Sequence, residues 1–230
     1  MRYNIILLDA DGTLLDFARS EYEAFSDTLA HFGLPDTQEI HAAYSKANDD
    51  QWKLLEKGLT TKSRLRVDRF ENFCRMFGFV VDSTEMADVY MHHLATKINL
   101  IDGAVDVCRT LSEHCRLYII TNGFKYVQQG RLFKSPLIEF MSGVFISEEI
   151  GAEKPSCEYF DKVKSLIEDF DPEKALVVGD SLSSDILGGI NAGLDTCWYN
   201  PQNKKNQNGL SITYTISDLF ELEDIILRGE

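Results

Sequence analysis

The sequence predicts an α/β protein in which a doubly wound parallel sheet is interrupted by one inserted all-helical segment. Short apolar runs that end abruptly in polar residues or glycine indicate buried strands. From about residue 102 onward such runs alternate with stretches of helical spacing, which is typical of a parallel sheet covered by helices. Between the first strand and residue 98 only helical spacing is found, so residues 16–98 form an insertion.

The first strand is predicted at residues 5–8, where four apolar residues precede two carboxylates, Asp9 and Asp11. In an open α/β sheet, ligands bind at the carboxyl ends of the strands, so both carboxylates should lie at the ligand crevice. Gly12 lets the chain turn sharply there. Two anions so close repel unless a cation or a shared proton lies between them, which favours a divalent metal site. The alternative is an ordinary strand-end turn, where Asp and Gly are common.

The inserted segment contains four predicted helices, over residues 17–32, 37–57, 60–77 and 82–98. Gly33 and Pro35 end the first helix. Glycines at positions 58 and 78 end the second and third. Asp82, followed three residues later by Glu85, is typical of a capping box and begins the fourth helix.

The rest of the chain alternates between predicted helices and strands. Buried strands are predicted at residues 117–120, 144–146, 175–178 and 196–199, with a weaker one at 213–216. Helices are predicted at residues 102–111, 124–133, 157–169 and 182–192, and a last helix begins near residue 217. Because strands alternate with helices, neighbouring strands should run parallel.

Composition argues against several classes of partner. The chain has 230 residues and a formal net charge of −14, which argues against a nucleic acid polymer or an anionic membrane. Five cysteines without a Cys-x-x-Cys pair indicate reduced thiols. The N-terminal apolar run is too short for a signal peptide, and no segment approaches the roughly 20 apolar residues of a membrane span. We therefore expect a cytoplasmic protein that acts on a small molecule.

Polar residues follow four of the predicted strands. They are Asp9 and Asp11, Thr121 and Asn122, Lys154 in the loop after the third strand, and Asp180. A parallel sheet would bring all of these strand ends to one edge. Taken singly, each has a plainer interpretation as a turn, a solvated surface lysine or a helix N-cap. Their occurrence at successive strand ends, in order, favours one shared site.

Together these residues resemble the four motifs of the haloacid-dehalogenase-like (HAD) phosphotransferases. The matching stretches are Asp9-x-Asp11-Gly-Thr, Thr121, Lys154 and Gly179-Asp180-x-x-x-x-Asp185. The resemblance implies a Rossmann-like α/β core domain of residues 1–15 and 99–230, with residues 16–98 as a helical cap domain. It also implies an enzyme that transfers a phosphoryl group to water, with Mg²⁺ as cofactor.

The same resemblance implies how the reaction proceeds. Asp9 would be the nucleophile that forms an aspartyl-phosphate. Asp11 would be the general acid that protonates the leaving oxygen, and then the base that activates water. Thr121, Asn122 and Lys154 would bind the phosphoryl oxygens, with Lys154 offsetting charge in the transition state.

The resemblance also implies a set of metal ligands. Mg²⁺ would be held by the carboxylates of Asp9 and Asp180 and by the main-chain carbonyl of Asp11. Asp185 would support these ligands from behind. A few carboxylates completed by water and phosphate oxygens are what Mg²⁺ prefers.

Longer stretches resemble the bacterial (noncanonical) pyrimidine 5′-nucleotidases, which hydrolyse uridine and thymidine monophosphates. These stretches are residues 120–124, 128–132, 146–149 and 184–194. One departure is Gly12, where that group often carries an acidic residue. The resemblance implies a pyrimidine nucleoside monophosphate as the substrate, and we expect the chain to be a monomer or a weak homodimer.

Other functions are compatible with the same core residues. The alternatives are a phosphoglycolate or sugar-phosphate phosphatase, a sugar-phosphate mutase, and a non-enzymatic binding protein on this fold. Substrate choice would fall to the cap, where Phe17, Tyr44 and Trp52 are candidates to stack on a base. Aromatic residues at helical spacing are more often core residues, so packing is the alternative role for each.

Overall fold

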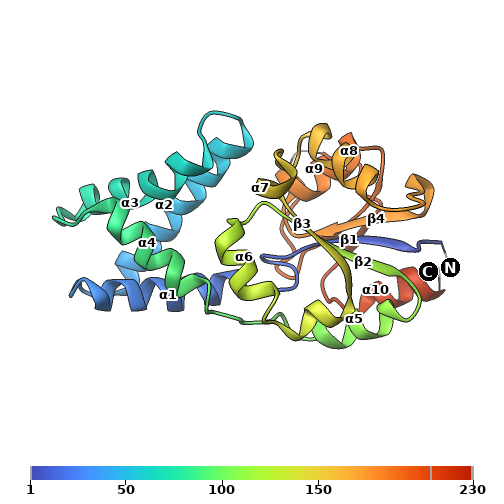
Figure 1. The fold of residues 1–230 in the computed structure, drawn as a ribbon, viewed down its shortest axis with the longest axis horizontal. Coiled ribbons are helices and arrows are strands. Elements are labelled where there is room, and N and C mark those ends of the chain that lie inside the picture. Colours follow the sequence, from blue (N-terminus) through green and yellow to red (C-terminus); the bar gives the residue numbers. More distant parts are fainter. Residues whose placement is uncertain (1, 208, 229–230) are drawn as a thin grey trace. The chain divides into compact units, whose positions relative to one another are not determined.

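The computed structural model describes residues 2–207 and 209–228. Within them, six parallel strands form one sheet in the order β3-β2-β1-β4-β5-β6 (Figure 1). They are β1 (Ile5–Asp9), β2 (Arg116–Thr121), β3 (Met141–Ile146), β4 (Ala175–Gly179), β5 (Asp195–Tyr199) and β6 (Tyr214–Ile216). The strand order reverses at β1, so the predicted doubly wound α/β fold is confirmed. The carboxyl ends of β1, β2 and β4 are neighbours at this switch point.

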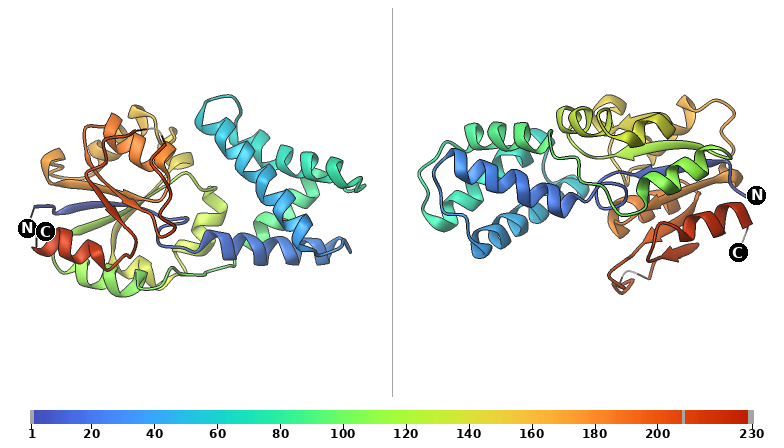
Figure 2. Two further views of the ribbon diagram at one scale, coloured as in Figure 1. Left: turned by 180° about the vertical axis from the view of Figure 1, so that it is seen from behind. Right: turned by 90° about the horizontal axis from the view of Figure 1, so that it is seen from below.

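Helices cover both faces of the sheet. On one face lie α5 (Ala104–Ser112), α10 (Glu221–Glu223) and the π-helical segment η4 (Asp224–Arg228) (Figure 1). On the other face lie α8 (Cys157–Leu166) and α9 (Leu187–Asn191) (Figure 2). Ile6 and Leu8 of β1 pack toward the first face, and Ile5 and Leu7 toward the second. Burial on both faces explains why the strands are continuous apolar runs.

Short elements connect the strands and helices of the sheet. They are the 3-10 segments η1 (Pro136–Phe140) and η2 (Pro172–Lys174), the helix α7 (Ser147–Ile150) and the π-helical segment η3 (Leu182–Ile186). The helix predicted at 182–192 is thus divided between η3 and α9, and the loop predicted after the third strand contains α7. β3 begins at residue 141 instead of 144, because Gly143 pairs with Tyr118 although it interrupts the apolar pattern.

A second compact unit consists of residues 18–98 and 126–131, whereas residues 1–17, 99–125 and 132–230 form the sheet unit. The unit of residues 18–98 and 126–131 is called the helical unit. It contains nearly all of α1 (Phe17–His31), all of α2 (Gln38–Glu56), α3 (Lys62–Phe77) and α4 (Ser83–Leu94), and most of α6 (Lys125–Leu132). Side chains of Thr37, Thr61 and Asp82 accept hydrogen bonds from the first turns of α2, α3 and α4, which fixes where these helices begin. The core and cap boundaries drawn from the sequence stay a prediction.

Aromatic side chains fill the core of the helical unit. Tyr44 is buried and stacks on Phe25 with ring centroids 3.9 Å apart, and its ring centroid lies 5.1 Å from that of Phe70. Phe17 and Trp52 are partly buried. Packing is therefore the role of Tyr44 that its contacts support.

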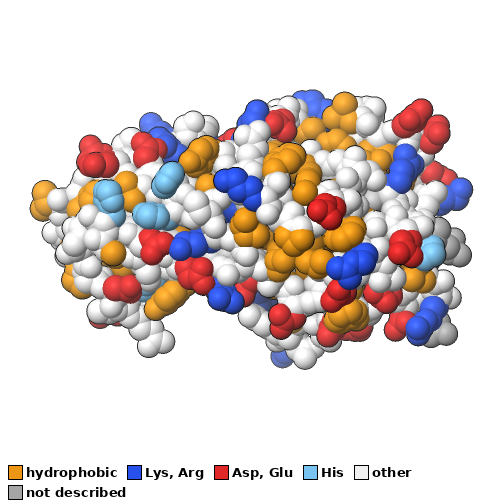
Figure 3. All heavy atoms as spheres, turned by 60° about the horizontal axis from the view of Figure 1, so that its bottom comes forward, with side chains coloured by type: hydrophobic (Ala, Val, Ile, Leu, Met, Phe, Trp, Pro, Cys, Tyr) orange, Lys and Arg blue, Asp and Glu red, His pale blue; other side chains and the backbone are white. Residues whose placement is uncertain are grey.

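The acidic excess of the chain is not gathered into one block on the face shown in Figure 3, where basic and acidic side chains are interspersed. Among the described residues, no helix combines the length and the apolar character needed to cross a membrane.

Candidate active site

The first two carboxylates lie at the carboxyl end of β1, near the middle of the sheet. Asp9 is the last residue of β1, and its side chain is buried. The main-chain N–H groups of residues 14 and 15 donate back to the carbonyl of Ala10 and close a tight turn. This turn keeps Asp11 next to the strand end with its side chain half-buried. Thr13 Oγ1 donates a hydrogen bond to Asp9 Oδ2 at 3.3 Å.

Gly12 gives this turn its shape. Its φ of +93° lies in the left-handed region that favours glycine. A Cβ atom at this position would lie 2.6 Å from Asp180 Oδ2. The glycine that departs from the nucleotidase pattern therefore leaves the space that the Asp180 carboxylate occupies.

Thr121 is the last residue of β2, the strand next to β1, and Asn122 follows it. The buried Thr121 accepts a hydrogen bond on Oγ1 from the N–H of Gly123 at 3.0 Å. The Asn122 side chain exchanges two hydrogen bonds with the main chain of Lys154. Asn122 Nδ2 donates to the Lys154 carbonyl at 2.8 Å, and the Lys154 N–H donates to Asn122 Oδ1 at 2.9 Å. These bonds tie the end of β2 to the loop that carries Lys154.

Lys154 is the cation at the centre of the site. Its side chain is only 1% exposed. Its Nζ donates to Asp9 Oδ1 at 2.7 Å, to Asp185 Oδ1 at 2.7 Å and to the Ile120 carbonyl at 2.9 Å. All three donors of the ammonium group are used. Lys154 is therefore a buried, paired cation and not a solvated surface lysine.

Asp180 and Asp185 lie beyond the end of β4. Asp185 is fully buried, and its Oδ2 accepts a hydrogen bond from the N–H of Ser181 at 3.1 Å. Asp180 is partly buried, and its main-chain carbonyl accepts a hydrogen bond from Trp198 Nε1 at 2.9 Å. Trp198 of β5 pairs with Gly179 of β4, so the sheet register places the indole next to Asp180.

Three of these carboxylates form a cluster that could hold a metal ion. One carboxylate oxygen from each of Asp9, Asp180 and Asp185 lies within 4.8 Å of the others. Carboxylate oxygens are the ligands that Mg²⁺ prefers, so the donor set fits this cation. Lys154 already binds one oxygen of Asp9 and one of Asp185. The predicted ligand set of Asp9, Asp180 and the Asp11 carbonyl stays a prediction.

The electrostatics of the cluster favour an added cation. Burial raises the pKa of Asp9 well above its ordinary value, and the charge of Asp185 raises it further. Burial and the charge of Asp185 also raise the pKa of Asp180 to about 7. Burial lowers the pKa of Lys154, but the charges of Asp185 and Asp9 outweigh this effect and raise it above its ordinary value. One ammonium group does not offset three carboxylates, and a divalent cation would.

The structure brings most of the predicted residues together. Asp9, Lys154 and Asp185 are joined by direct ion pairs, and Asp180 lies in the same cluster. Trp198 is the residue that sequence reasoning missed. It lies in an apolar run that predicts only a buried strand. Its contact with Asp180 depends on the register of β5 on β4, which the sequence does not show.

The comparison with protein families identifies the chain. A model of the haloacid dehalogenase-like hydrolases matches residues 3–193. The chain belongs to this family, so the predicted family and the predicted identity as a hydrolase enzyme are confirmed.

The relatives that align over nearly the whole chain include three that are 32% to 38% identical. A putative HAD-hydrolase YfnB of Bacillus subtilis is 38% identical, covering 98% of this chain and 96% of the relative. The pyrimidine 5′-nucleotidase PynA of Streptococcus pneumoniae is 37% identical, covering 98% and 96%. The pyrimidine 5′-nucleotidase YjjG of Escherichia coli is 32% identical, covering 99% and 100%.

Solved structures of other proteins are similar over the full fold. The crystal structure of YfnB from Bacillus subtilis bound to magnesium matches with a TM-score of 0.94 at 38% identity, covering 98% of this chain and 99% of that chain. The L-2-haloacid dehalogenase from Xanthobacter autotrophicus matches with a TM-score of 0.79 at 16% identity, covering 99% of each chain. The second likeness concerns the fold alone.

Proposed function

We propose that this protein is a Mg²⁺-dependent phosphomonoesterase that acts through an aspartyl-phosphate on Asp9 and hydrolyses pyrimidine nucleoside monophosphates. The observation that carries the proposal is the buried Lys154 ammonium between the carboxylates of Asp9 and Asp185, next to the Asp180 carboxylate. This arrangement places a cation beside Asp9 and fixes the orientation of its carboxylate at the carboxyl edge of the sheet.

In the first half of the reaction, a carboxylate oxygen of Asp9 attacks the phosphorus atom of the substrate. A bond forms between this oxygen and phosphorus while the bond to the leaving oxygen breaks. Asp11 gives its proton to the leaving oxygen, so the nucleoside departs as a neutral alcohol. Thr121 binds the phosphoryl oxygens, and the positive charge of Lys154 beside Asp9 stabilises the negative charge that they carry.

In the second half, water hydrolyses the aspartyl-phosphate. Asp11, now ionised, takes a proton from the water molecule while the oxygen of that water forms a bond to phosphorus. The bond between phosphorus and the Asp9 oxygen breaks, which releases inorganic phosphate and restores the carboxylate. Asp11 ends the cycle protonated and ready for the next substrate.

Mg²⁺ fits this site because Asp9 and Asp180 offer carboxylate oxygens and Asp11 offers a main-chain carbonyl, with Asp185 behind them. When bound, it supplies positive charge for the phosphoryl oxygens of the substrate. The relative crystallised with magnesium supports this choice of cation.

The substrate class rests on the relatives named pyrimidine 5′-nucleotidases, at 37% and 32% identity over nearly the whole chain. A nucleoside monophosphate has one phosphoryl group, which is what a site formed by Asp9, Thr121 and Lys154 can accommodate. The cytoplasmic location and the state as a monomer or weak homodimer belong to the same proposal.

Initial rates of phosphate release with Mg²⁺ test the proposal. The panel contains uridine, deoxyuridine, thymidine, adenosine and guanosine monophosphates, with phosphoglycolate and glucose 6-phosphate as rival substrates. We expect the highest kcat/KM on the pyrimidine nucleotides, and no turnover when EDTA removes the metal.

Each other result has a defined meaning. A preference for phosphoglycolate or a sugar phosphate would overturn the substrate class and keep the phosphatase chemistry. Interconversion of hexose 1- and 6-phosphates without free phosphate would identify a mutase. Folded protein that releases phosphate from none of these compounds would support a binding protein.

A further inference from the structure

The position of the Lys154 ammonium group depends on how its main chain is held. A lysine side chain has four rotatable carbon-carbon bonds and carries substantial rotamer entropy, so the side chain alone does not fix the position of its ammonium group. In this structure Nζ makes three hydrogen bonds of 2.7 to 2.9 Å, two of them to carboxylates. A small shift of the Lys154 main chain would break this geometry.

No regular element fixes the Lys154 main chain. Residues 151–156 form turns and bends that lie outside any helix or strand. The preceding helix α7 ends at residue 150, and the next helix, α8, begins at residue 157. The register of the sheet therefore does not extend to Lys154.

The side chain of Asn122 supplies the missing anchor. It donates to the Lys154 carbonyl at 2.8 Å and accepts from the Lys154 N–H at 2.9 Å. Both bonds go to the same residue, so they fix the orientation of its main chain as well as its position. This pair of bonds is what a neighbouring strand would provide in a sheet.

Asn122 is itself held by the sheet. It directly follows β2, in which Ile120 pairs with Asp9 of β1. The same Ile120 offers its carbonyl to Lys154 Nζ. A continuous set of contacts thus runs from β2 through Asn122 to the main chain of Lys154, and from its ammonium group back to Asp9.

We propose that Asn122 is a positioning residue that sets the Lys154 ammonium group between Asp9 and Asp185. This role rests on the proposed phosphatase function and differs from the phosphate-binding role that the sequence predicts for Asn122. The residue acts through Lys154, so its loss should change the chemical step more than substrate binding.

The chain offers a matched control for the test. Asn206 makes the same pair of bonds with Leu210, donating to its carbonyl at 2.8 Å and accepting from its N–H at 3.1 Å. Asn206→Ala therefore removes the same two kinds of hydrogen bond from another loop of the sheet unit. If Asn122→Ala has a larger effect than Asn206→Ala, the difference is due to the place of Asn122 beside Lys154 and not to the loss of two hydrogen bonds as such.

Steady-state kinetics on the best substrate of the panel give the first readout. We expect Asn122→Ala to lower kcat by about 10–100-fold, as for the loss of two hydrogen bonds expressed in the transition state. KM should stay within about threefold, and Asn206→Ala should keep both constants. Asn122→Asp keeps the acceptor but sets a carboxylate oxygen against the Lys154 carbonyl, so it should not restore kcat.

A double-mutant cycle with Lys154→Met separates positioning from direct phosphate binding. If Asn122 acts through Lys154, Asn122→Ala should have no further effect on kcat in the Lys154→Met background. Effects that multiply, or a rise in KM with unchanged kcat, would overturn the proposal.

Side-chain ammonium NMR of ¹⁵N-lysine-labelled protein gives a readout that needs no turnover. The buried, triply bonded Lys154 should give a protected signal, assigned by its loss in Lys154→Met. It should shift or broaden in Asn122→Ala and stay in place in Asn206→Ala. An unmoved signal would overturn the proposal. If no phosphate ester is hydrolysed, the phosphatase function fails while this signal still decides the role of Asn122.

Discussion

A Cβ atom on Gly179 would lie 2.3 Å from Cγ of Asp185, so the glycine that ends β4 makes room for the buried carboxylate. Asp185 is fully buried, and it binds both Lys154 Nζ and the N–H of Ser181. Because Asp185 is buried and held by these bonds, a side chain on Gly179 would have to displace it. In the pair Gly179-Asp180, Asp180 is therefore a candidate metal ligand, and Gly179 is needed because a larger residue would collide with Asp185.

Gly179→Ala should displace Asp185 and remove one carboxylate partner of Lys154. We expect the free energy of unfolding to fall by about 1–3 kcal/mol, as for overpacking of a buried site, and kcat to fall with it. Gly143→Ala is the matched control in β3, since its Cβ would meet the Tyr118 ring edge at 3.2 Å. Denaturant unfolding should place this control within about 1 kcal/mol of the unvaried chain. Equal stability losses in both variants would contradict the steric argument.

Asp9→Asn and Asp11→Asn should both remove phosphatase activity, by different routes. Asp9→Asn cannot form the covalent intermediate, so acid quenching with ³²P-labelled substrate should leave no label on the protein. Asp11→Asn should slow both leaving-group departure and hydrolysis by about 10²–10⁴-fold, because both steps lose their acid or base. Near-normal turnover in either variant would contradict the assigned roles.

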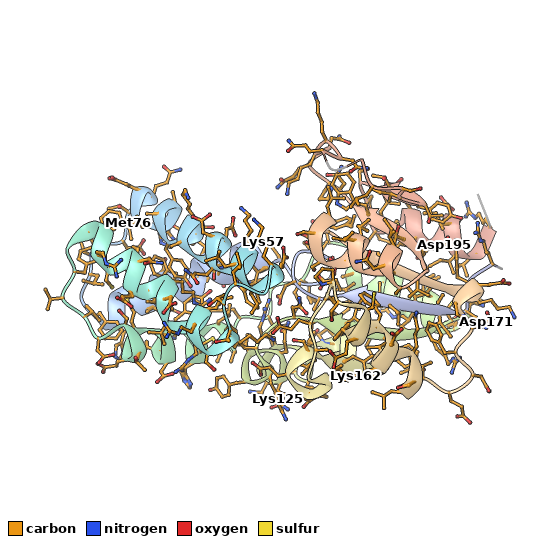
Figure 4. All side chains as sticks on the ribbon, turned by 90° about the horizontal axis from the view of Figure 1, so that it is seen from above. Lys57, Met76, Lys125, Lys162, Asp171 and Asp195 are labelled. Carbon is orange, nitrogen blue, oxygen red and sulfur yellow. The ribbon has the colours of Figure 1, made fainter. Side chains whose placement is uncertain are left out.

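The control for these substitutions is Asp195→Asn. Asp195 begins β5 and lies with Asp171 at the amino edge of the sheet, opposite the candidate site (Figure 4). It binds Arg2 at 2.7 Å and the Tyr3 hydroxyl at 2.6 Å, so it is also a bonded carboxylate. The same change of charge at this edge should leave kcat within about twofold, since surface charges act weakly at a distance.

The parallel fold could be predicted because its strands are buried on both faces. A run such as residues 175–178 is continuously apolar, and the polar residue that follows marks its end. Boundaries set by pairing could not be predicted in this way. Gly143 belongs to β3 only because Tyr118 pairs with it, and the π-helical turn at 182–186 has no counterpart in the sequence pattern.

The candidate site could be predicted to the extent that its residues follow strands. Asp9, Asp180 and Asp185 meet as expected, because parallel neighbours end at one edge. The contacts of Asn122 and Trp198 could not be predicted, since they join segments 32 and 18 residues apart through register and loop conformation. A side chain that bonds to the main chain of a segment distant in the sequence leaves no pattern in a single sequence.

Trp198→Phe should weaken Mg²⁺ binding, because the indole N–H holds the main-chain carbonyl of Asp180 at 2.9 Å. Loss of one such bond should raise the Kd for Mg²⁺ by about 2–10-fold, as measured by calorimetry. Trp52→Phe, in α2 of the helical unit, is the matched control and should leave the Kd unchanged. Normal Mg²⁺ affinity in Trp198→Phe would show that Trp198 does not support the metal site.

Binding of Mg²⁺ should depend on pH through Asp180, whose pKa is raised to about 7. Below this pH the metal-free site keeps a proton that Mg²⁺ must displace, so Kd should fall about tenfold from pH 6 to pH 8. In the unfolded chain the same carboxyl ionises near pH 4. The metal-free fold should therefore lose stability as pH rises from about 4 through 7, and the raised pKa of Asp9 acts in the same direction.

Thermal unfolding with and without Mg²⁺ at pH 6, 7 and 8 measures both effects. The increase in Tm on adding Mg²⁺ should be largest at pH 8, where the cation relieves the most repulsion among the carboxylates. Asp180→Asn should abolish the increase and flatten the pH dependence of the metal-free protein, whereas Asp195→Asn should keep both. A Mg²⁺-induced increase that is equal at pH 6 and pH 8 would show that Asp180 does not exchange a proton for the metal.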